Sequence, residues 1–114
     1  MTDQQTHRQL CLLEDLATIF AREHLRAWLR GGWALDCLLG AITRPHADID
    51  LVTWLRHRPR LHRLLPAHGF ALDRELPVQT DFTKWGQYLQ IVFVARRPDG
   101  RVVVPGIPGW RWRP

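Results

Sequence analysis

The spacing of apolar residues is helical near the start of the chain. Between residues 10 and 20 they recur at steps of three and four, which predicts an amphipathic helix that covers one face of a sheet. The residues on this stripe are Leu10, Leu13, Leu16, Ala17 and Phe20.

Glycine and proline divide the middle of the chain into short elements. Residues 27–30 predict a strand, and residues 33–39 predict a helix that ends at Gly40, because glycine tolerates the positive φ of a helix C-terminus. Residues 48–54 predict a second strand. A third helix is expected over residues 59–69, with a proline at its start and a glycine at its end.

The last third of the chain has the pattern of strands. Four are expected, over residues 70–75, 79–84, 87–94 and 101–104. The sequence PDG at residues 98–100 predicts a hairpin turn between the last two. The order α-β-α-β-α-β-β-β-β predicts an α/β (α+β) fold with a mixed, mostly antiparallel sheet flanked by helices. We expect residues 1–104 to form a single domain and residues 105–114 an irregular tail.

A glycine pair, Gly31-Gly32, lies between the first predicted strand and the helix that follows it. This order points backbone N–H groups and the positive end of the helix dipole toward one spot, which suits a phosphate. A plain turn is the alternative, and the pair alone does not decide between the two.

Two aspartates, Asp48 and Asp50, begin the strand over residues 48–54. Side chains two positions apart share one face of a strand, so both carboxylates point the same way while Ile49 and Leu51 point to the core. Magnesium is commonly held by one or two carboxylates together with phosphate oxygens and water. A phosphate-binding turn followed by paired carboxylates therefore predicts a site for a nucleoside triphosphate and magnesium.

The charge of the chain favours anionic partners without identifying them. The formal net charge is +5, and Lys84 is the only lysine, so arginine supplies nearly all of the positive charge. Arginine suits bidentate contacts with phosphate, although its use in place of lysine is also typical of GC-rich genomes. The arginine-rich residues 56–63 could bind nucleic acid, but a solvated helix face is the simpler interpretation. We therefore do not expect nucleic acid as a partner.

Cys11 and Cys37 lie on helix-patterned segments and show no metal or disulfide spacing, so we expect two buried thiols. Residues 1–9 lack the apolar run that is typical of a signal peptide, and no apolar stretch is long enough to span a bilayer. We expect a cytoplasmic protein with no membrane partner.

Two motifs in this chain resemble a known family. GGWALD at residues 31–36 and TRPHADID at residues 43–50 are similar, in order and in residue type, to the signature of the aminoglycoside and lincosamide nucleotidyltransferases. These enzymes belong to the polymerase-beta-like nucleotidyltransferase superfamily. The resemblance continues more weakly through residues 86–91 and 98–100. It implies a nucleotidyltransferase fold and a role in antibiotic resistance.

The resemblance also implies a reaction and assigns residues to it. A nucleoside monophosphate would pass from ATP or another nucleoside triphosphate to a hydroxyl of a small molecule such as an aminoglycoside or lincosamide antibiotic. Gly31 and Gly32 would bind the triphosphate, while Asp48 and Asp50 would hold Mg²⁺ and act in catalysis.

Three further residues of the two motifs, Trp33, Arg44 and His46, are expected at the nucleotide. His46 could touch a phosphate or orient Asp48, or it could be an ordinary turn histidine. Asp36 could cap the short helix, pair with Arg44 to brace the loop, or contact a ligand directly.

The third carboxylate of the family corresponds to Gln90 in this chain. A glutamine amide cannot accept a proton near neutral pH and is a poor substitute for an anionic metal ligand. Asp81 on the preceding strand is the expected replacement, because adjacent strands lie about 4.8 Å apart and a side chain can reach across. Asp73 and Glu75 are weaker candidates, and all three could instead be solvated carboxylates at the sheet edge.

The resemblance leaves the activity of this chain open. Family members continue into a further, largely helical segment that this chain does not contain, so it could be a fragment or a minimal homologue. One alternative is a non-catalytic homologue that binds a nucleotide or a partner. Another is an antitoxin-type enzyme that nucleotidylates a partner protein. A homodimer also stays open.

Overall fold

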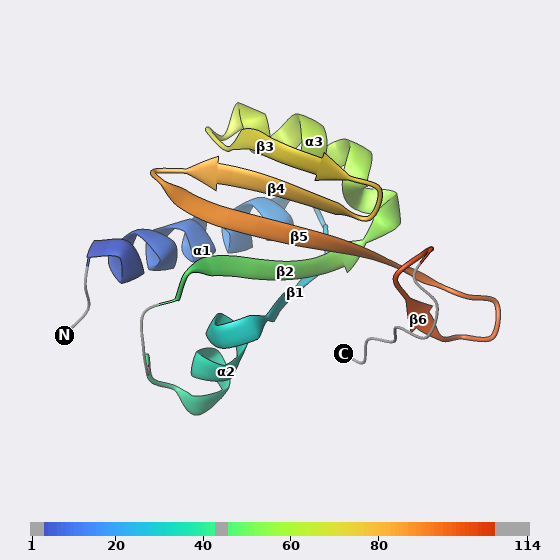
Figure 1. Cartoon of the computed structure of the whole chain (residues 1–114), viewed down its shortest axis with the longest axis horizontal. Coiled ribbons are helices and arrows are strands. Elements are labelled where there is room, and N and C mark those ends of the chain that lie inside the picture. The colour runs from blue at the N-terminus through green and yellow to red at the C-terminus, as the bar shows by residue number, and fades with distance from the viewer. Residues whose placement is uncertain (1–3, 43–45, 107–114) are drawn as a thin grey trace.

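The structure is a computed structural model, and it describes residues 4–42 and 46–106. The elements are α1 (Gln4–Arg22), β1 (Ala27–Arg30), α2 (Gly31–Leu39), β2 (Asp48–Trp54), the 3-10 turn η1 (Leu55–His57), α3 (Arg58–Ala67), β3 (Ala71–Leu76), β4 (Gln79–Lys84), β5 (Gln87–Arg96) and β6 (Val102–Val103). Their order along the chain is the predicted one (Figure 1). The strands β1, β2 and β4 have the predicted bounds.

The strands form one sheet in the order β1-β2-β5-β4-β3, and β6 pairs with the end of β5. Strands β2 and β5 are parallel, and the other neighbouring pairs are antiparallel. The mixed, mostly antiparallel sheet is therefore confirmed. Figure 1 shows β1 and β3 at opposite edges of this sheet, with β2 and β5 in its middle.

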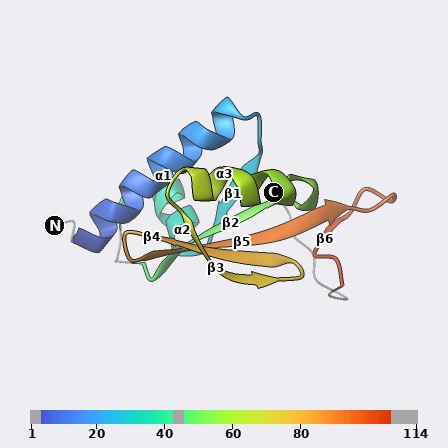
Figure 2. The same ribbon diagram turned by 90° about the horizontal axis from the view of Figure 1, so that it is seen from above.

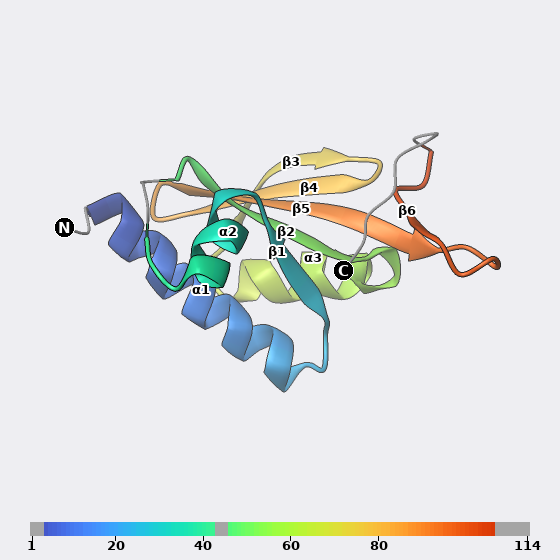
Figure 3. The ribbon, with the colours of Figure 1, turned by 90° about the horizontal axis from the view of Figure 1, so that it is seen from below.

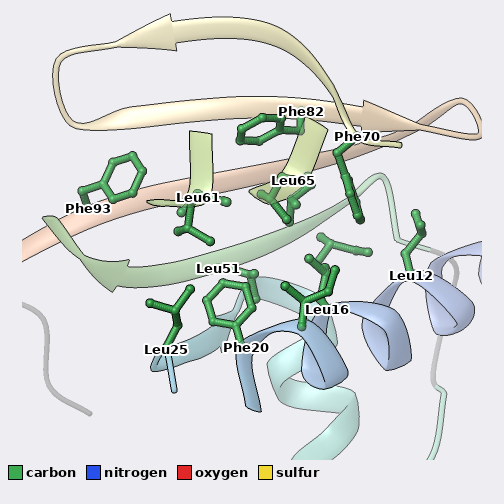
Figure 4. Close-up of a cluster of buried hydrophobic side chains, with 14 of the residues drawn as sticks. Leu12, Leu16, Phe20, Leu25, Leu51, Leu61, Leu65, Phe70, Phe82 and Phe93 are labelled. Atoms are coloured by element: carbon green, nitrogen blue, oxygen red, sulfur yellow. The ribbon is translucent and has the colours of Figure 1, made fainter. Parts of the chain in front are cut away.

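The main core lies between the sheet and the helices α1 and α3, which cover the same face (Figures 2 and 3). Helix α1 contributes Leu12, Leu16, Ile19 and Phe20, α3 contributes Leu61 and Leu65, and the central strands contribute Ile49, Leu51, Phe82, Leu89, Ile91 and Phe93. Figure 4 shows these side chains filling the space between the two layers. Burying such an apolar set supplies most of the driving force for folding.

Helix α1 is longer than its apolar pattern predicts and turns a different stripe to the core. It begins at Gln4. The apolar pattern does not include its first turns, because the residues buried there, Thr6 and Gln9, are polar. The predicted stripe is only partly right. Leu16 and Phe20 are buried, whereas Leu10 and Leu13 are half-buried and Ala17 is exposed.

Leu10 and Leu13 of α1 face a cavity of about 680 Å³ between α1, β1 and α2, whose lining also includes Trp28 and Cys37. Neither predicted metal-binding aspartate lines it.

Cys37 is exposed and Cys11 is half-buried, so the prediction of two buried thiols was wrong. Helix α2 is short and lies at the edge of the sheet, which leaves one of its sides uncovered. Within the described residues, no helix is both long enough and apolar enough to cross a membrane.

His62 of α3 contacts three residues of the sheet. His62 Nε2 lies 2.8 Å from Thr80 Oγ1 of β4, its ring meets Phe82 edge-on, and its Nδ1 lies 3.8 Å from the Glu75 carboxylate of β3. Burial lowers the pKa of His62, and Arg58 lowers it further while Glu75 opposes the shift.

We expect the lowered pKa of His62 to make the folded protein less stable in mild acid. Because the pKa of His62 is lower in the folded protein, the unfolded chain binds the proton more readily, so the free energy of unfolding falls as the pH drops below about 6.5. Urea denaturation at a series of pH values would measure the slope. We expect His62→Gln to reduce the slope without removing it, since the pKa of His57 is also lowered by burial. The exposed His7→Gln is the control, and an unchanged slope in His62→Gln would contradict the prediction.

Candidate active site

Two carboxylates of the sheet, Asp50 and Asp81, lie in one row of paired residues that crosses five strands. The register pairs Arg30 of β1 with Asp50 of β2, Asp50 with Gln90 of β5, Gln90 with Asp81 of β4, and Asp81 with Arg74 of β3. Directly paired residues share a face of a sheet, so all five side chains project from the face opposite α1 and α3. We call Arg30, Asp50, Gln90, Asp81 and Arg74 the carboxylate row.

Strand β2 turns both of its aspartates to this face. Ile49 and Leu51 are 0% and 5% exposed in the core, so the alternation of the strand sends Asp48 and Asp50 to the other side. Asp48 is paired with Tyr88 of β5, and each of these two residues lies two residues before the carboxylate row on its own strand. The predicted orientation of the two carboxylates is confirmed.

The negative charge around Asp50 is only partly neutralised. Burial and the neighbouring Asp48 raise the pKa of Asp50, Arg30 opposes them, and Asp81 adds a smaller upward shift. Oxygen donors with an excess of negative charge suit a hard cation such as Mg²⁺, which needs only one or two protein carboxylates when phosphate oxygens and water complete its shell. The donors present therefore fit magnesium.

The glycine turn lies directly against this carboxylate. Helix α2 begins at Gly31, whose φ is +71°, and a Cβ atom added there would lie 2.7 Å from Asp50 Oδ2. Only glycine allows both the backbone conformation and this close approach. The structure thus brings the predicted phosphate turn, Gly31-Gly32, and the predicted metal-binding aspartates to one place.

Trp33 and His46 belong to a buried polar network beneath that turn. Trp33 Nε1 donates to Gln9 Oε1 at 2.6 Å, and Gln9 Nε2 donates to the His46 carbonyl and to Gln87 Oε1, both at 3.0 Å. Trp33 and His46 are 2% and 4% exposed. In this arrangement they link α1, α2 and the start of β5, and their expected contact with the nucleotide remains a prediction.

The same network fixes the partner of Asp36. His46 Nε2 lies 2.6 Å from Asp36 Oδ2, and both side chains are buried. The bond ties the end of the loop before β2 to α2. Pairing with Arg44 was one of three alternatives for Asp36, beside capping the helix and contacting a ligand. Arg44 lies outside the described residues, and so does the nucleotide contact predicted for Arg44.

Gln9 and Gln87 were missed by the sequence analysis. Both are buried, at 0% and 7% exposed, and both are polar residues on segments where polarity normally indicates exposure to solvent. The one signal in the sequence is that Gln9 lies three residues before Leu12 and seven before Leu16, so helical spacing puts it on the same side as these two leucines.

Asp81 is on the correct face but is not a direct neighbour of Asp50. It is 7% exposed, and Gln79 Nε2 donates to its Oδ1 at 2.9 Å. Gln90 lies between the two aspartates, so their Cα atoms are about 10 Å apart, twice the strand spacing. In keeping with this distance, no group of three His, Cys, Asp or Glu side chains is placed to hold a metal within residues 4–42 and 46–106.

The two weaker candidates for the third carboxylate lie elsewhere. Glu75 is on the helix side of the sheet, where it pairs with Arg58 at 3.3 Å. Asp73 lies at the irregularity of β3 between Leu72 and Arg74 and is exposed. Neither belongs to the carboxylate row.

The sequence of this site and its surroundings matches a known family. Residues 12–113 match the family model described as aminoglycoside-2''-adenylyltransferase. The chain belongs to this family. The match covers the glycine turn, both aspartates of β2 and all the strands, so the resemblance to the aminoglycoside and lincosamide nucleotidyltransferases is confirmed.

Individual relatives of this adenylyltransferase family agree. A 2''-aminoglycoside nucleotidyltransferase from Klebsiella pneumoniae is 34% identical over 68 residues, which is 60% of this chain and 38% of that protein. A lincosamide resistance protein from Staphylococcus haemolyticus is 31% identical over 70 residues, covering 60% of this chain and 40% of that protein. The chain thus spans about two-fifths of the length of the curated relatives it matches.

Solved structures confirm the nucleotidyltransferase fold. The lincosamide antibiotic adenylyltransferase LnuA, bound to lincomycin, superposes with a TM-score of 0.74 at 24% identity, covering 88% of this chain and 65% of that one. ANT(2'')-Ia, in complex with adenylyl-2''-tobramycin, gives a TM-score of 0.77 at 24% identity, covering 90% and 58%.

Proposed function

We propose that this protein is a nucleotidyltransferase that transfers AMP from ATP to a hydroxyl of a small molecule of the aminoglycoside or lincosamide type. The observation that carries the proposal is the close approach of the glycine turn to Asp50, because it brings a helix N-terminus, which suits a phosphate, against a carboxylate that shares its face with Asp48. Membership of the adenylyltransferase family supports the reaction type.

The residues of the site divide the work of phosphoryl transfer. The N–H groups of Gly31 and Gly32 would bind the triphosphate at the positive end of α2. Asp48 and Asp50 would hold Mg²⁺, which when bound neutralises charge on the phosphates and helps to orient them. The buried network of Gln9 would keep α2 and β2 in register. Positioning is the main contribution of the protein in this chemistry.

Asp81 would serve the acceptor hydroxyl. It lies on the same face as Asp50, on the side of Asp50 that is away from the glycine turn. If pyrophosphate leaves on the side of the glycine turn, the acceptor hydroxyl would attack the α-phosphate from the side of Asp81. As a carboxylate it can accept the proton that Gln90 cannot. The exposed ring of Tyr88 borders this part of the face and could contact the acceptor.

The acceptor class comes from the relatives. LnuA is described with lincomycin bound and ANT(2'')-Ia with adenylyl-2''-tobramycin. Lincomycin and tobramycin are therefore the first acceptors to test.

Titration calorimetry and mass spectrometry together test the proposal. We expect ATP to bind in the presence of Mg²⁺, and incubation with lincomycin or tobramycin to yield an adenylylated product and pyrophosphate. Absence of ATP binding would refute the nucleotidyltransferase assignment. ATP binding without product from any hydroxyl acceptor would show instead a nucleotide-binding homologue, the outcome to which Gln90 would point.

A pair of substitutions tests the position of the third carboxylate. We expect Asp81→Asn to lower the rate of transfer by about 100-fold with little change in ATP affinity, since a general base contributes at least this much to a rate. Gln90→Asp should restore part of the rate in the Asp81→Asn background, because Gln90 lies between Asp50 and Asp81 on the same face. Single-turnover kinetics would measure both. An unchanged rate in Asp81→Asn would exclude Asp81 as the base.

A further inference from the structure

The two ends of the carboxylate row are arginines in different surroundings. Arg30 and Arg74 are each the register partner of an aspartate of the row on the neighbouring strand, and both are exposed. Within the described part of the chain neither guanidinium forms an ion pair with a carboxylate at 4.0 Å or less. Arg74 is on the edge strand β3, whereas Arg30 is the residue that leads from β1 into α2.

Arg30 occupies a position where a cation is unfavourable. It is the N-cap residue of α2, with extended backbone and no side-chain cap hydrogen bond. Serine, threonine, aspartate or asparagine is preferred at an N-cap, because the side chain can accept a hydrogen bond from the first N–H groups. Arginine cannot accept one, and its charge is repelled by the positive end of the helix dipole.

Asp50 is the anion of the row that lies beside this helix end, and once its carboxylate holds the metal, a further anion would offset the charge of Arg30. The N–H groups at the start of α2 and the Arg30 guanidinium are then donors to the same group, and both charges become favourable. Residues that break a local rule of stability are concentrated at functional sites. The remaining neighbour of Arg30 in the row, Asp50, is itself expected to be occupied by the metal.

We propose that Arg30 binds the β- and γ-phosphates of the nucleoside triphosphate, together with the N-terminal N–H groups of α2. This assignment rests on the proposed function and adds to it a residue outside the glycine pair and the aspartates. Arg30 lies on the side of Asp50 opposite to Asp81, so the pyrophosphate would lie over β1 and the acceptor over β4. A bidentate guanidinium at the leaving group also stabilises the charge that develops there.

Binding measurements with ATP and AMP test the assignment. Calorimetric titration in Mg²⁺ should show ATP affinity about 10-fold lower in Arg30→Gln than in the wild type, the loss of one charge-assisted hydrogen-bonding group. AMP affinity should be unchanged, because AMP has no β- or γ-phosphate. Arg30→Lys should recover part of the loss, since lysine keeps the charge but not the bidentate geometry.

Arg74→Gln is the matched control, because it removes another exposed arginine from the other end of the same row. ATP affinity should be unchanged in it. Without ATP, Arg30→Gln should melt close to the wild-type temperature, since removing a cation from the N-terminus of a helix and removing its attraction to Asp50 act in opposite directions. A purely structural role for Arg30 would lower the melting temperature instead.

The outcomes separate this assignment from the function on which it rests. If the wild type binds no ATP, the proposed function is wrong and the role of Arg30 falls with it. If the wild type binds ATP and Arg30→Gln binds it equally well, only the role of Arg30 is overturned. An equal loss in Arg30→Gln and Arg74→Gln, or an equal loss for AMP and ATP, would indicate general charge attraction and would also overturn it.

Discussion

Replacing Asp48 and Asp50 together with asparagine is expected to lower the rate of nucleotidyl transfer by at least about 1,000-fold while leaving the fold intact. Removing a single preorganised hydrogen-bond donor from an oxyanion hole costs about 100- to 1,000-fold in rate, and here both anionic ligands expected for Mg²⁺ are removed. Asparagine has nearly the shape of aspartate, so packing around β2 is preserved. Single-turnover kinetics with ATP, Mg²⁺ and an acceptor would measure the loss.

The same variant should be at least as stable as the wild type without metal. The pKa of Asp50 is raised in the folded protein by burial and by Asp48, so the stability that Asp50 gives is present below its unfolded pKa and is lost as the pH rises through the folded one. At neutral pH the ionised carboxylate is therefore a cost that asparagine removes. Thermal melts should show this, and Mg²⁺ with ATP should raise the melting temperature of the wild type but not of the variant.

Asp73→Asn is the control for these measurements, because Asp73 is an exposed carboxylate outside the carboxylate row. It should keep both the activity and the response to Mg²⁺. A double variant of Asp48 and Asp50 that still transfers nucleotide would remove the basis of the metal assignment. A double variant that melts well below the wild type would show that the two aspartates serve the fold.

The elements of this fold were predictable because local pattern and tertiary structure agree. In β2 the alternation that sends Asp48 and Asp50 outward also sends Ile49 and Leu51 into the core. At Gly40 the φ of +74° that ends α2 is one that glycine adopts readily. The orientation of the two aspartates could therefore be deduced from the sequence, and with it half of the site.

The other half depends on which strands are neighbours, and no local pattern contains that information. The sequence analysis correctly paired the strand of Asp81 with that of Gln90. It did not predict that β5, last of the long strands, lies next to β2 and so puts Gln90 between Asp50 and Asp81. The pairing of Arg30 with Asp50 was not predicted for the same reason, because β1 and β2 are neighbours in the sheet although α2 separates them in the sequence.

The buried network was hidden for a different reason. Gln9 is fully buried because Trp33 and His46, from two other segments, supply its hydrogen-bond partners. A polar side chain becomes a core residue only when such partners are present, and a single segment does not show them. Amphipathic patterns therefore place such a residue on the wrong side of the helix.

Gly31→Ala is expected to have the second large effect, on stability and activity together. Alanine at a φ of +71° costs about 1–2 kcal/mol in backbone strain. The new Cβ would also lie 2.7 Å from Asp50 Oδ2, and since a carboxylate end moves more easily than backbone, Asp50 would be displaced. A shift of about 1 Å in a catalytic group can cost about 100-fold in rate. Urea denaturation and single-turnover kinetics would measure the two losses.

Gly40→Ala separates the two causes. Gly40 ends α2 with a φ of +74°, close to that of Gly31, but no atom lies within 4 Å of an added Cβ. It should therefore lose a similar amount of stability and keep the rate of transfer. If both variants keep the rate, the close approach of the glycine turn to Asp50 is not needed for catalysis. If both lose it, the position of α2 as a whole matters, and the contact between Gly31 and Asp50 has no special role.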